Sequence, residues 1–243
     1  MKKLLTITLL SLFIFPSLVS AQKTIQEAYI KYEITDVKSD DPQMEAALNM
    51  MKGSTMEIYF NSGKQRAVVD MMGGMVKMNT INNVENKETV MLMDMMGRKI
   101  KVKGTEEEFK QMNDQNTPDP EEIKKQITYN KSKTKTIAGY PCYEAVFKMP
   151  QDENTGMDMT LTAYVTDKIV SPKSVIRNME TVELQGLPLE YTIGASGFSM
   201  TYTAVQVDEK VDEKSFEIPD GYEEMTIDQF METMGAMGGG MGF

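Results

Sequence analysis

The sequence predicts an α+β protein built on one curved antiparallel sheet with a few helices on one face. Along most of the chain apolar residues alternate with polar residues, as is typical of antiparallel strands with one dry and one wet face. Short runs rich in glycine and asparagine separate the alternating stretches, where hairpin turns are expected. Only a few short segments combine helical spacing with an N-terminal cap, so helices are the minor component.

The first 21 residues have the organisation of a secretory signal peptide. Lys2 and Lys3 precede an apolar stretch over residues 4–15, and residues 19–21 form a small-residue cleavage site. We therefore expect residues 1–21 to be removed and the mature protein to be exported, soluble and located in the periplasm. The residue directly after the cleavage site is Gln22 and not a cysteine, so a lipid anchor is not expected. No later run reaches about 18 uninterrupted apolar residues, so no transmembrane helix is expected.

The alternating stretches predict the strands in chain order. They cover residues 28–34, 56–60, 67–71, 91–95, 100–102, 143–149, 159–165, 189–193 and 198–204. Turn signals separate them at residues 61–63, 73–74, 82–83 and 195–197. One lysine-rich stretch is expected to form a solvated edge strand, because lysine protects the open edges of sheets. It comprises Lys124, Lys125, Lys131, Lys133 and Lys135, and contact with anionic head groups is the alternative.

Four segments carry helix signals. Asp41 followed by Pro42 resembles an N-cap with proline at the first helical position, which predicts a helix over residues 41–52. Thr105 and Glu108 form a capping box that opens a second helix. Two more are expected around residues 119–127, where the helix would include Ile123 and Ile127, and over residues 226–234. Residues 22–234 are expected to form a single domain, and the Gly- and Met-rich residues 235–243 a flexible tail.

The composition excludes several classes of function. The chain has 26 Lys and Arg against 36 Asp and Glu, a net charge of -10, which argues against nucleic acid as a partner. There is no histidine, so the commonest general base and metal ligand is missing. The single cysteine, Cys142, excludes an internal disulfide and is expected to be buried and inert. We therefore expect a protein that is not an enzyme and that uses no cofactor.

Methionine is the unusual component, with 24 residues among the 243. Its flexible thioether could fill an irregular core, line a pocket that accepts varied apolar ligands, or bind Cu(I). The third interpretation needs several sulfur atoms at one point. The candidates for such a site recur every three or four residues near the C-terminus: Met231, Met234, Met237 and Met241.

The dry face of the strands is the candidate ligand-binding surface. It carries Met, Phe, Tyr and Ile and almost no charge, as ligand pockets usually do. A filled core would have the same pattern, so both interpretations stay open. The residues expected to line this face are Ile58, Phe60, Val69, Met71, Met91, Met93, Phe147, Met159, Leu161 and Tyr191.

Residues 136–145, which include the run Gly-Tyr-Pro-Cys-Tyr, resemble the "I-A-G-Y-x-C" strand of an exported bacterial family, domain of unknown function 4412. Residues 90–94, 186–190 and 211–222 resemble other parts of the same family. The family is similar in strand order to periplasmic lipoprotein carriers of the LolA, LolB and LppX type. This resemblance implies a half-open barrel whose concave face is covered by helices. It implies no catalytic residues.

The expected role is that of a non-enzymatic exported protein that binds or carries an apolar ligand, such as a lipid or an acyl chain. A methionine-based Cu(I)-binding protein and an envelope interaction module with a packed core are the alternatives. Peripheral contact with a membrane is compatible with the first role. The oligomeric state and the ligand are left open by the sequence.

Overall fold

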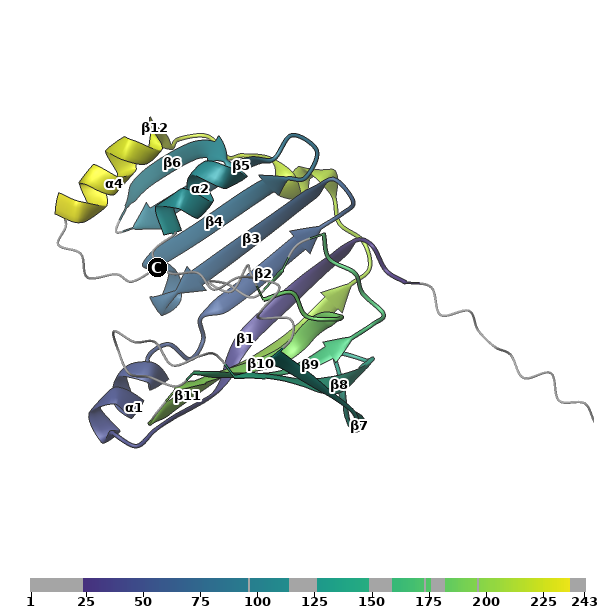
Figure 1. The fold of residues 1–243 in the computed structure, drawn as a ribbon. Helices are drawn as coiled ribbons and strands as arrows, with labels where there is room; N and C mark the ends of the chain where they lie inside the picture. The colour runs from purple at the N-terminus through teal and green to yellow at the C-terminus, as the bar shows by residue number, and fades with distance from the viewer. Residues whose placement is uncertain are drawn as a thin grey trace, which may run out of the picture.

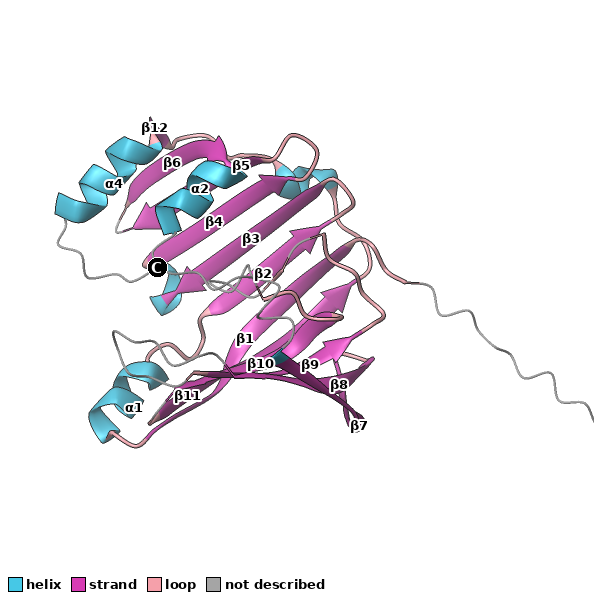
Figure 2. Ribbon diagram, viewed as in Figure 1, coloured by secondary structure: helices cyan, strands magenta, loops and turns pink. Residues whose placement is uncertain are grey.

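The computed structural model describes residues 24–95, 97–113, 126–148, 159–172, 174–175, 182–195 and 197–236. The expected signal peptide, residues 1–21, lies outside these ranges, as do residues 237–243 of the expected tail. Gly235 and Ala236 are the last residues of the C-terminal helix. Within the described chain all named strands belong to one 12-stranded sheet (Figures 1 and 2).

The sheet is assembled from two meanders. The first comprises β1 (Ala28–Ser39), β2 (Thr55–Phe60), β3 (Lys64–Met71), β4 (Val76–Asn83), β5 (Glu88–Met95) and β6 (Arg98–Thr105). The second comprises β7 (Ile127–Ile137), β8 (Tyr140–Lys148), β9 (Thr160–Thr166), β10 (Leu187–Ala195) and β11 (Phe198–Asp208). The short β12 (Glu223–Met225) pairs in parallel with β6, and every other pairing between named strands is antiparallel. Pairing of β1 with β11 joins the meanders, so the strand order is β12-β6-β5-β4-β3-β2-β1-β11-β10-β9-β8-β7.

The sheet curls strongly without closing. Neighbouring strands lie about 4.8 Å apart, so side chains from strands that are not neighbours meet only when the sheet bends. Two strands separate β2 from β10, yet the Tyr191 hydroxyl lies 3.9 Å from the Met56 sulfur. The Tyr32 hydroxyl likewise donates to the Pro188 carbonyl across β11, at 2.8 Å. Register shifts in the β1–β11, β9–β10 and β7–β8 pairs accompany the bend, since bulges increase local twist. Because β7 and β12 end the strand order, the predicted half-open, curved sheet is confirmed.

Hairpin geometry explains the most recognisable motif of the sequence. The β7–β8 turn places Ala138 at φ +47° and Gly139 at φ +87°. A two-residue hairpin whose central residues both have positive φ matches the twist of its strands, and glycine adopts that conformation without strain. The Gly-Tyr-Pro-Cys run is therefore explained by a turn and the strand that follows it.

Three α-helices of the described residues accompany the sheet: α1 (Pro42–Asn49), α2 (Glu106–Asn113) and α4 (Ile227–Ala236). The Gln43 amide donates to Asp41 at 2.8 Å and so caps α1. In the capping box of α2, the Thr105 amide donates to Glu108 at 2.7 Å, and this hydrogen bond lowers the pKa of the Glu108 carboxyl. The α4 box is made by Thr226 and Gln229 in the same way. The three corresponding sequence predictions are confirmed.

Two local predictions are corrected. Ile127 was expected in a helix, but it opens β7, where it pairs with Phe147; residues 114–125 lie outside the described ranges. Asn82 and Asn83 were expected in a turn, but they end β4, and the turn follows at residues 84–87. Asparagine marks turns often, yet here the cross-strand partners Thr89 and Glu88 extend the ladder by two residues.

The hydrophobic core has two parts on the concave face. The larger cluster lies between β1–β2 and β8–β10, and includes Tyr32, Ile58, Phe60, Phe147 and Leu161. The smaller cluster lies under α4 and α2 on β4–β6 (Figure 1). On the opposite face Ile81, Val90 and Leu92 pack with Tyr222.

Candidate functional site

All ten residues expected to line the dry face lie on the concave face of the sheet. Strand register shows this directly, because residues in the same register row point to the same side. One row runs through Tyr32, Met56, Val69, Met78, Met93 and Ile100. A second row, on the other meander, runs through Ile127, Phe147, Leu161, Ile193 and Met200. Neither row contains a charged residue, and Met159 lies one residue before β9 in the same alternation.

The ten residues differ in how far they are buried. Ile58, Phe60, Phe147 and Leu161 are at most 1% exposed and form part of the larger core cluster. Val69, Met71 and Met159 are only partly buried. The concave face is thus packed toward β1 and β9 and more accessible toward β3. Whether these residues line a ligand remains a prediction.

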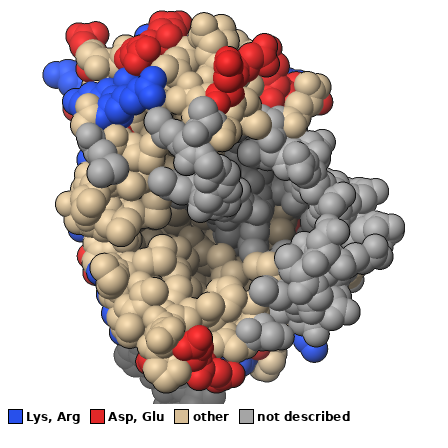
Figure 3. Space-filling model, turned by 90° about the vertical axis from the view of Figure 1, so that its left-hand side faces the viewer, with Lys and Arg blue, Asp and Glu red and all other residues tan. Residues whose placement is uncertain are grey.

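Figure 3 views the molecule from the open side of the curve. The described surface in the middle of this side is mostly uncharged, and acidic side chains gather at its upper and lower borders. Among the described elements, α2 and α4 pack on β5 and β6, and α1 packs on β1. The uncharged character predicted from the alternation is therefore visible on this side of the molecule.

The structure brings methionines together beneath α4, among them Met71, Met91 and Met93 of the expected dry face. The cluster around Phe230 of α4 contains six of them: Met71, Met78, Met91, Met93, Met95 and Met225. The C-terminal candidates are arranged differently. Met231 is 47% exposed on α4, Met234 lies on the same helix, and Met237 and Met241 lie outside the described residues. The expected C-terminal metal site therefore stays untested, and the thioethers that do converge fill the space between the sheet and α4.

A polar row crosses one end of the concave face, and sequence reasoning missed it. In this row Phe60 of β2 pairs with Gln65 of β3, which pairs with Asn82 of β4 and then Thr89 of β5. The Thr89 hydroxyl donates to the Asn82 side-chain oxygen at 2.8 Å. Gln65 is only 3% exposed. In the sequence, Gln65 stands two residues before Ala67 and four before Val69, and this spacing could have placed Gln65 on the same face.

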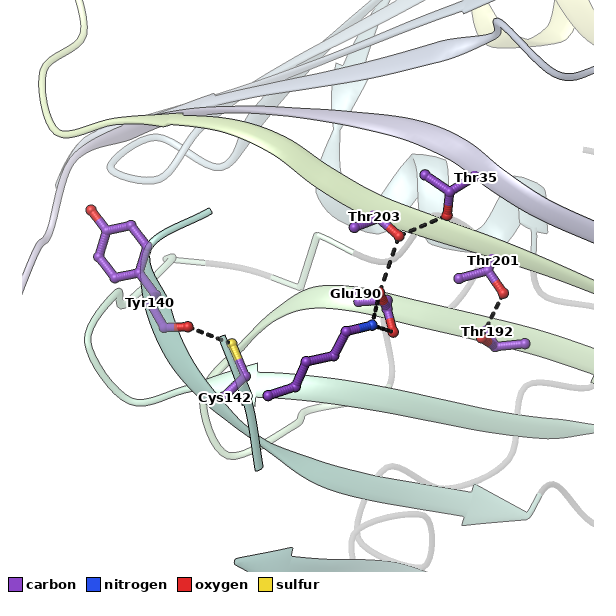
Figure 4. A network of polar contacts seen from close by, with 8 residues as sticks. Thr35, Tyr140, Cys142, Glu190, Thr192, Thr201 and Thr203 are labelled. Atoms are coloured by element: carbon purple, nitrogen blue, oxygen red, sulfur yellow. Dashed lines mark hydrogen bonds and ion pairs between the residues drawn. The ribbon is translucent and has the colours of Figure 1, made fainter. Parts of the chain in front are cut away.

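The convex face of the second meander is polar and paired. Figure 4 shows Thr35, Thr203 and Glu190 linked in series, with Thr192 bonded to Thr201 beside them. Lys135 of the edge strand β7 binds Glu190 at 2.5 Å, and Lys133 binds Glu144. The described part of the lysine-rich stretch therefore lies in an edge strand, as predicted, and Lys133 and Lys135 bind carboxylates of this chain.

Cys142 is buried, as expected, with 2% of its surface exposed. Its thiol donates weakly to the Tyr140 carbonyl at 3.5 Å, and burial raises the pKa of the thiol to about 11. We expect native protein at pH 8 to react with iodoacetamide roughly a hundredfold more slowly than a free thiol, because thiolate is the reactive species. Mass spectrometry of labelled samples, with and without guanidinium, measures this. Equal labelling in both samples would contradict the buried position.

The surface of the described residues is recessed at both ends of β1. One recess, of about 320 Å³, lies at the end of β1 and β2 and is lined by residues 24–27, Asn61, Ser62 and Glu209. The other, of about 260 Å³, lies beside Asp40 and Gly197 at the opposite end of β1. Both are lined mainly by polar residues, and neither lies over the apolar rows. The concave rows, not these recesses, carry the apolar surface that was predicted.

The fold and this surface define a class: a half-open antiparallel sheet whose concave face is uncharged except at its β6–β12 edge, where Arg98 and Glu223 lie. No protein-family model matches the sequence, and a search of curated proteins finds no match. None of the described helices is long and apolar enough to cross a membrane.

Solved structures with a similar arrangement share little sequence with this chain. One belongs to the MucA/MucB complex of Pseudomonas aeruginosa, with 11% identity, a TM-score of 0.33, and alignment over 79% of this chain and 56% of that one. Another is LprF from Mycobacterium bovis, with 15% identity, a TM-score of 0.35, and coverage of 83% and 92%. A third, from Vibrio parahaemolyticus, is described as an outer membrane lipoprotein-sorting protein domain, with 8% identity, a TM-score of 0.30, and coverage of 81% and 91%. The chain thus spans little more than half of the first. These likenesses concern the architecture of the sheet.

Proposed function

We propose that this protein is an exported, non-enzymatic carrier that binds a lipid or another ligand with an acyl chain on the concave face of the sheet. The observation that supports the proposal is the pair of uncharged register rows through Val69 and Leu161. They extend across both meanders of one continuous sheet.

The physical basis of binding would be water exclusion. Burial of apolar surface is worth about 25 cal/mol per Å², so an acyl chain lying across these rows would bind without charged anchors. The methionines on β3–β5 suit this role, because unbranched thioethers adjust to ligands of different shape. The partly buried positions Val69 and Met71 mark where the ligand would first make contact.

The compartment and the family are part of the same proposal. Cleavage after residue 21 would release the mature chain into the periplasm, where a carrier of this kind could make peripheral contact with a membrane. The strand at residues 136–145 supports a relationship to domain of unknown function 4412. N-terminal sequencing of the secreted protein tests the cleavage site, which we expect to leave Gln22 as the first residue.

Native mass spectrometry of protein purified without detergent tests the carrier function directly. A lipid-sized adduct, released by organic extraction, would support the proposal and define the ligand class. A protein mass without adduct, combined with no binding of added fatty acids or phospholipids, would exclude the carrier. That outcome would favour an interaction module with a packed core, and titration with Cu(I) would then test the methionine alternative.

Replacement of Val69 by aspartate should abolish binding of a fluorescent fatty acid, with a loss of at least about a hundredfold. Val69 lies between Met56 and Met78 in its register row, so a carboxylate there would have to be buried against the bound chain. Val205→Asp on β11 is the matched control, because Val205 is 47% exposed. Equal affinities in two variants with native circular dichroism would place the ligand elsewhere.

A further inference from the structure

The buried end of the polar row contains an acceptor with no partner among the residues that the structure describes. Gln65 is 3% exposed, and none of the described residues donates a hydrogen bond to its side-chain oxygen Oε1. A buried acceptor of this kind costs free energy, because the water it lost on folding has not been replaced. Such groups are uncommon in folded proteins, so an unpartnered one indicates a position that another molecule can complete.

The position of Gln65 connects this acceptor with the proposed ligand surface. On β3 the residues Gln65, Ala67, Val69 and Met71 alternate onto the concave face, and Ala67 and Val69 pack against the larger core cluster. Gln65 is paired with Phe60 on one side and Asn82 on the other. The acceptor thus lies near one end of β3, on the same face as the apolar row through Val69.

The register partners of Gln65 are uncharged: Phe60 on one side is apolar, and Asn82 on the other is polar. The Asn82 oxygen is occupied by the Thr89 hydroxyl, and the next partner across the sheet is Gly104 on β6. Gly104 lies directly beneath α2 and α4, since a Cβ there would be 2.8 Å from Ile227 and 3.3 Å from Phe109. The row therefore offers amide and hydroxyl groups and no cation that could balance a phosphate or a carboxylate.

We propose that the ligand is an amphipathic lipid with a neutral head group, and that a hydroxyl or amide N–H of this head donates to Gln65 Oε1. Its acyl chain lies along β3 toward Met71, across the apolar rows. The six residue steps from Gln65 to Met71 span about 20 Å of strand, which is the length of a long acyl chain. This inference rests on the carrier function proposed above and specifies the chemical class of its ligand.

Three ligands with the same acyl chain test the head-group requirement on the wild-type protein: 1-monooleoylglycerol, methyl oleate and oleate. Displacement of a fluorescent fatty acid reports each affinity. We expect the glycerol ester to bind about five- to tenfold more tightly than methyl oleate, since one hydrogen bond is gained and tenfold corresponds to about 1.4 kcal/mol. Oleate should bind no better than the glycerol ester, because its charge has no partner in the polar row.

Gln65→Met tests the residue. Methionine has nearly the same length as glutamine but cannot accept the bond, so the variant should bind all esters alike. Its melting temperature without ligand should equal or exceed that of the wild type, because an unpartnered buried acceptor has been removed. Gln206→Met on β11 is the matched control; Gln206 is exposed and bonds Asp208.

The outcomes separate the two proposals. Failure of every ligand to bind the wild type would overturn the carrier function. Equal binding of the glycerol and methyl esters to the wild type would overturn the head-group inference alone, and this comparison needs no variant. Tighter binding of oleate, or a preference for the glycerol ester that survives in a folded Gln65→Met variant, would also overturn it.

Discussion

Phe147→Ala is expected to lower the free energy of unfolding by about 3–5 kcal/mol, among the largest effects of a single substitution in this protein. Phe147 is 1% exposed and lies between Ile127 and Leu161 in its register row. Truncation would remove a large apolar side chain and leave a cavity that a sheet paired on both sides cannot close. Urea denaturation followed by circular dichroism measures the change.

The neighbouring residue supplies the control. Val146 points to the convex face and is only partly buried, so Val146→Ala should cost distinctly less. The size of the Phe147 effect also separates two interpretations of the concave face. A cost below about 1.5 kcal/mol would mean that the ring already borders an open space, and its contribution would then appear as lost ligand affinity.

Gly104→Val should reduce the free energy of unfolding by about 3 kcal/mol and separate α4 from the sheet. A Cβ at this position would lie 2.8 Å from Ile227 Cδ1 and 3.2 Å from Glu108 Oε2, so side chains of both helices would have to move. The movement would uncover Phe230, which is 3% exposed, together with the methionines that surround it. Hydrogen exchange across residues 227–236 is the sensitive measurement.

Gly194→Val is the matched substitution for this test. Gly194 is also a strand glycine, but its nearest neighbours would be 3.8 Å from an added Cβ. We expect it to leave exchange in α4 unchanged. If hydrogen exchange in α4 is as slow in both variants as in the wild type, close contact at Gly104 does not hold the helix in place.

Much of the fold follows from local chemistry. Alternation with a period of two decides which side of a strand each residue occupies, so Ile58, Met91 and Leu161 could be assigned to one face before their strands were placed. The caps at Asp41, Thr105 and Thr226 are also local, because each contact joins residues two or three apart. Ile127 shows the limit of this approach. Its position suited a helix, but pairing with Phe147, twenty residues later, makes it the start of a strand.

The sequence by itself determined most of the strands, the caps and the mostly uncharged character of one face, since these depend on residues close together in the chain. It missed β4 and β12. Only the tertiary structure decided which residues from distant parts of the chain meet on that face. Pairing of β1 with β11 joins residues about 170 positions apart, and the curl brings Tyr191 to Met56. The methionine cluster around Phe230 and the unpartnered oxygen of Gln65 also depend on strand order and helix position. Neighbours in space are set by long-range packing, and no local period encodes them.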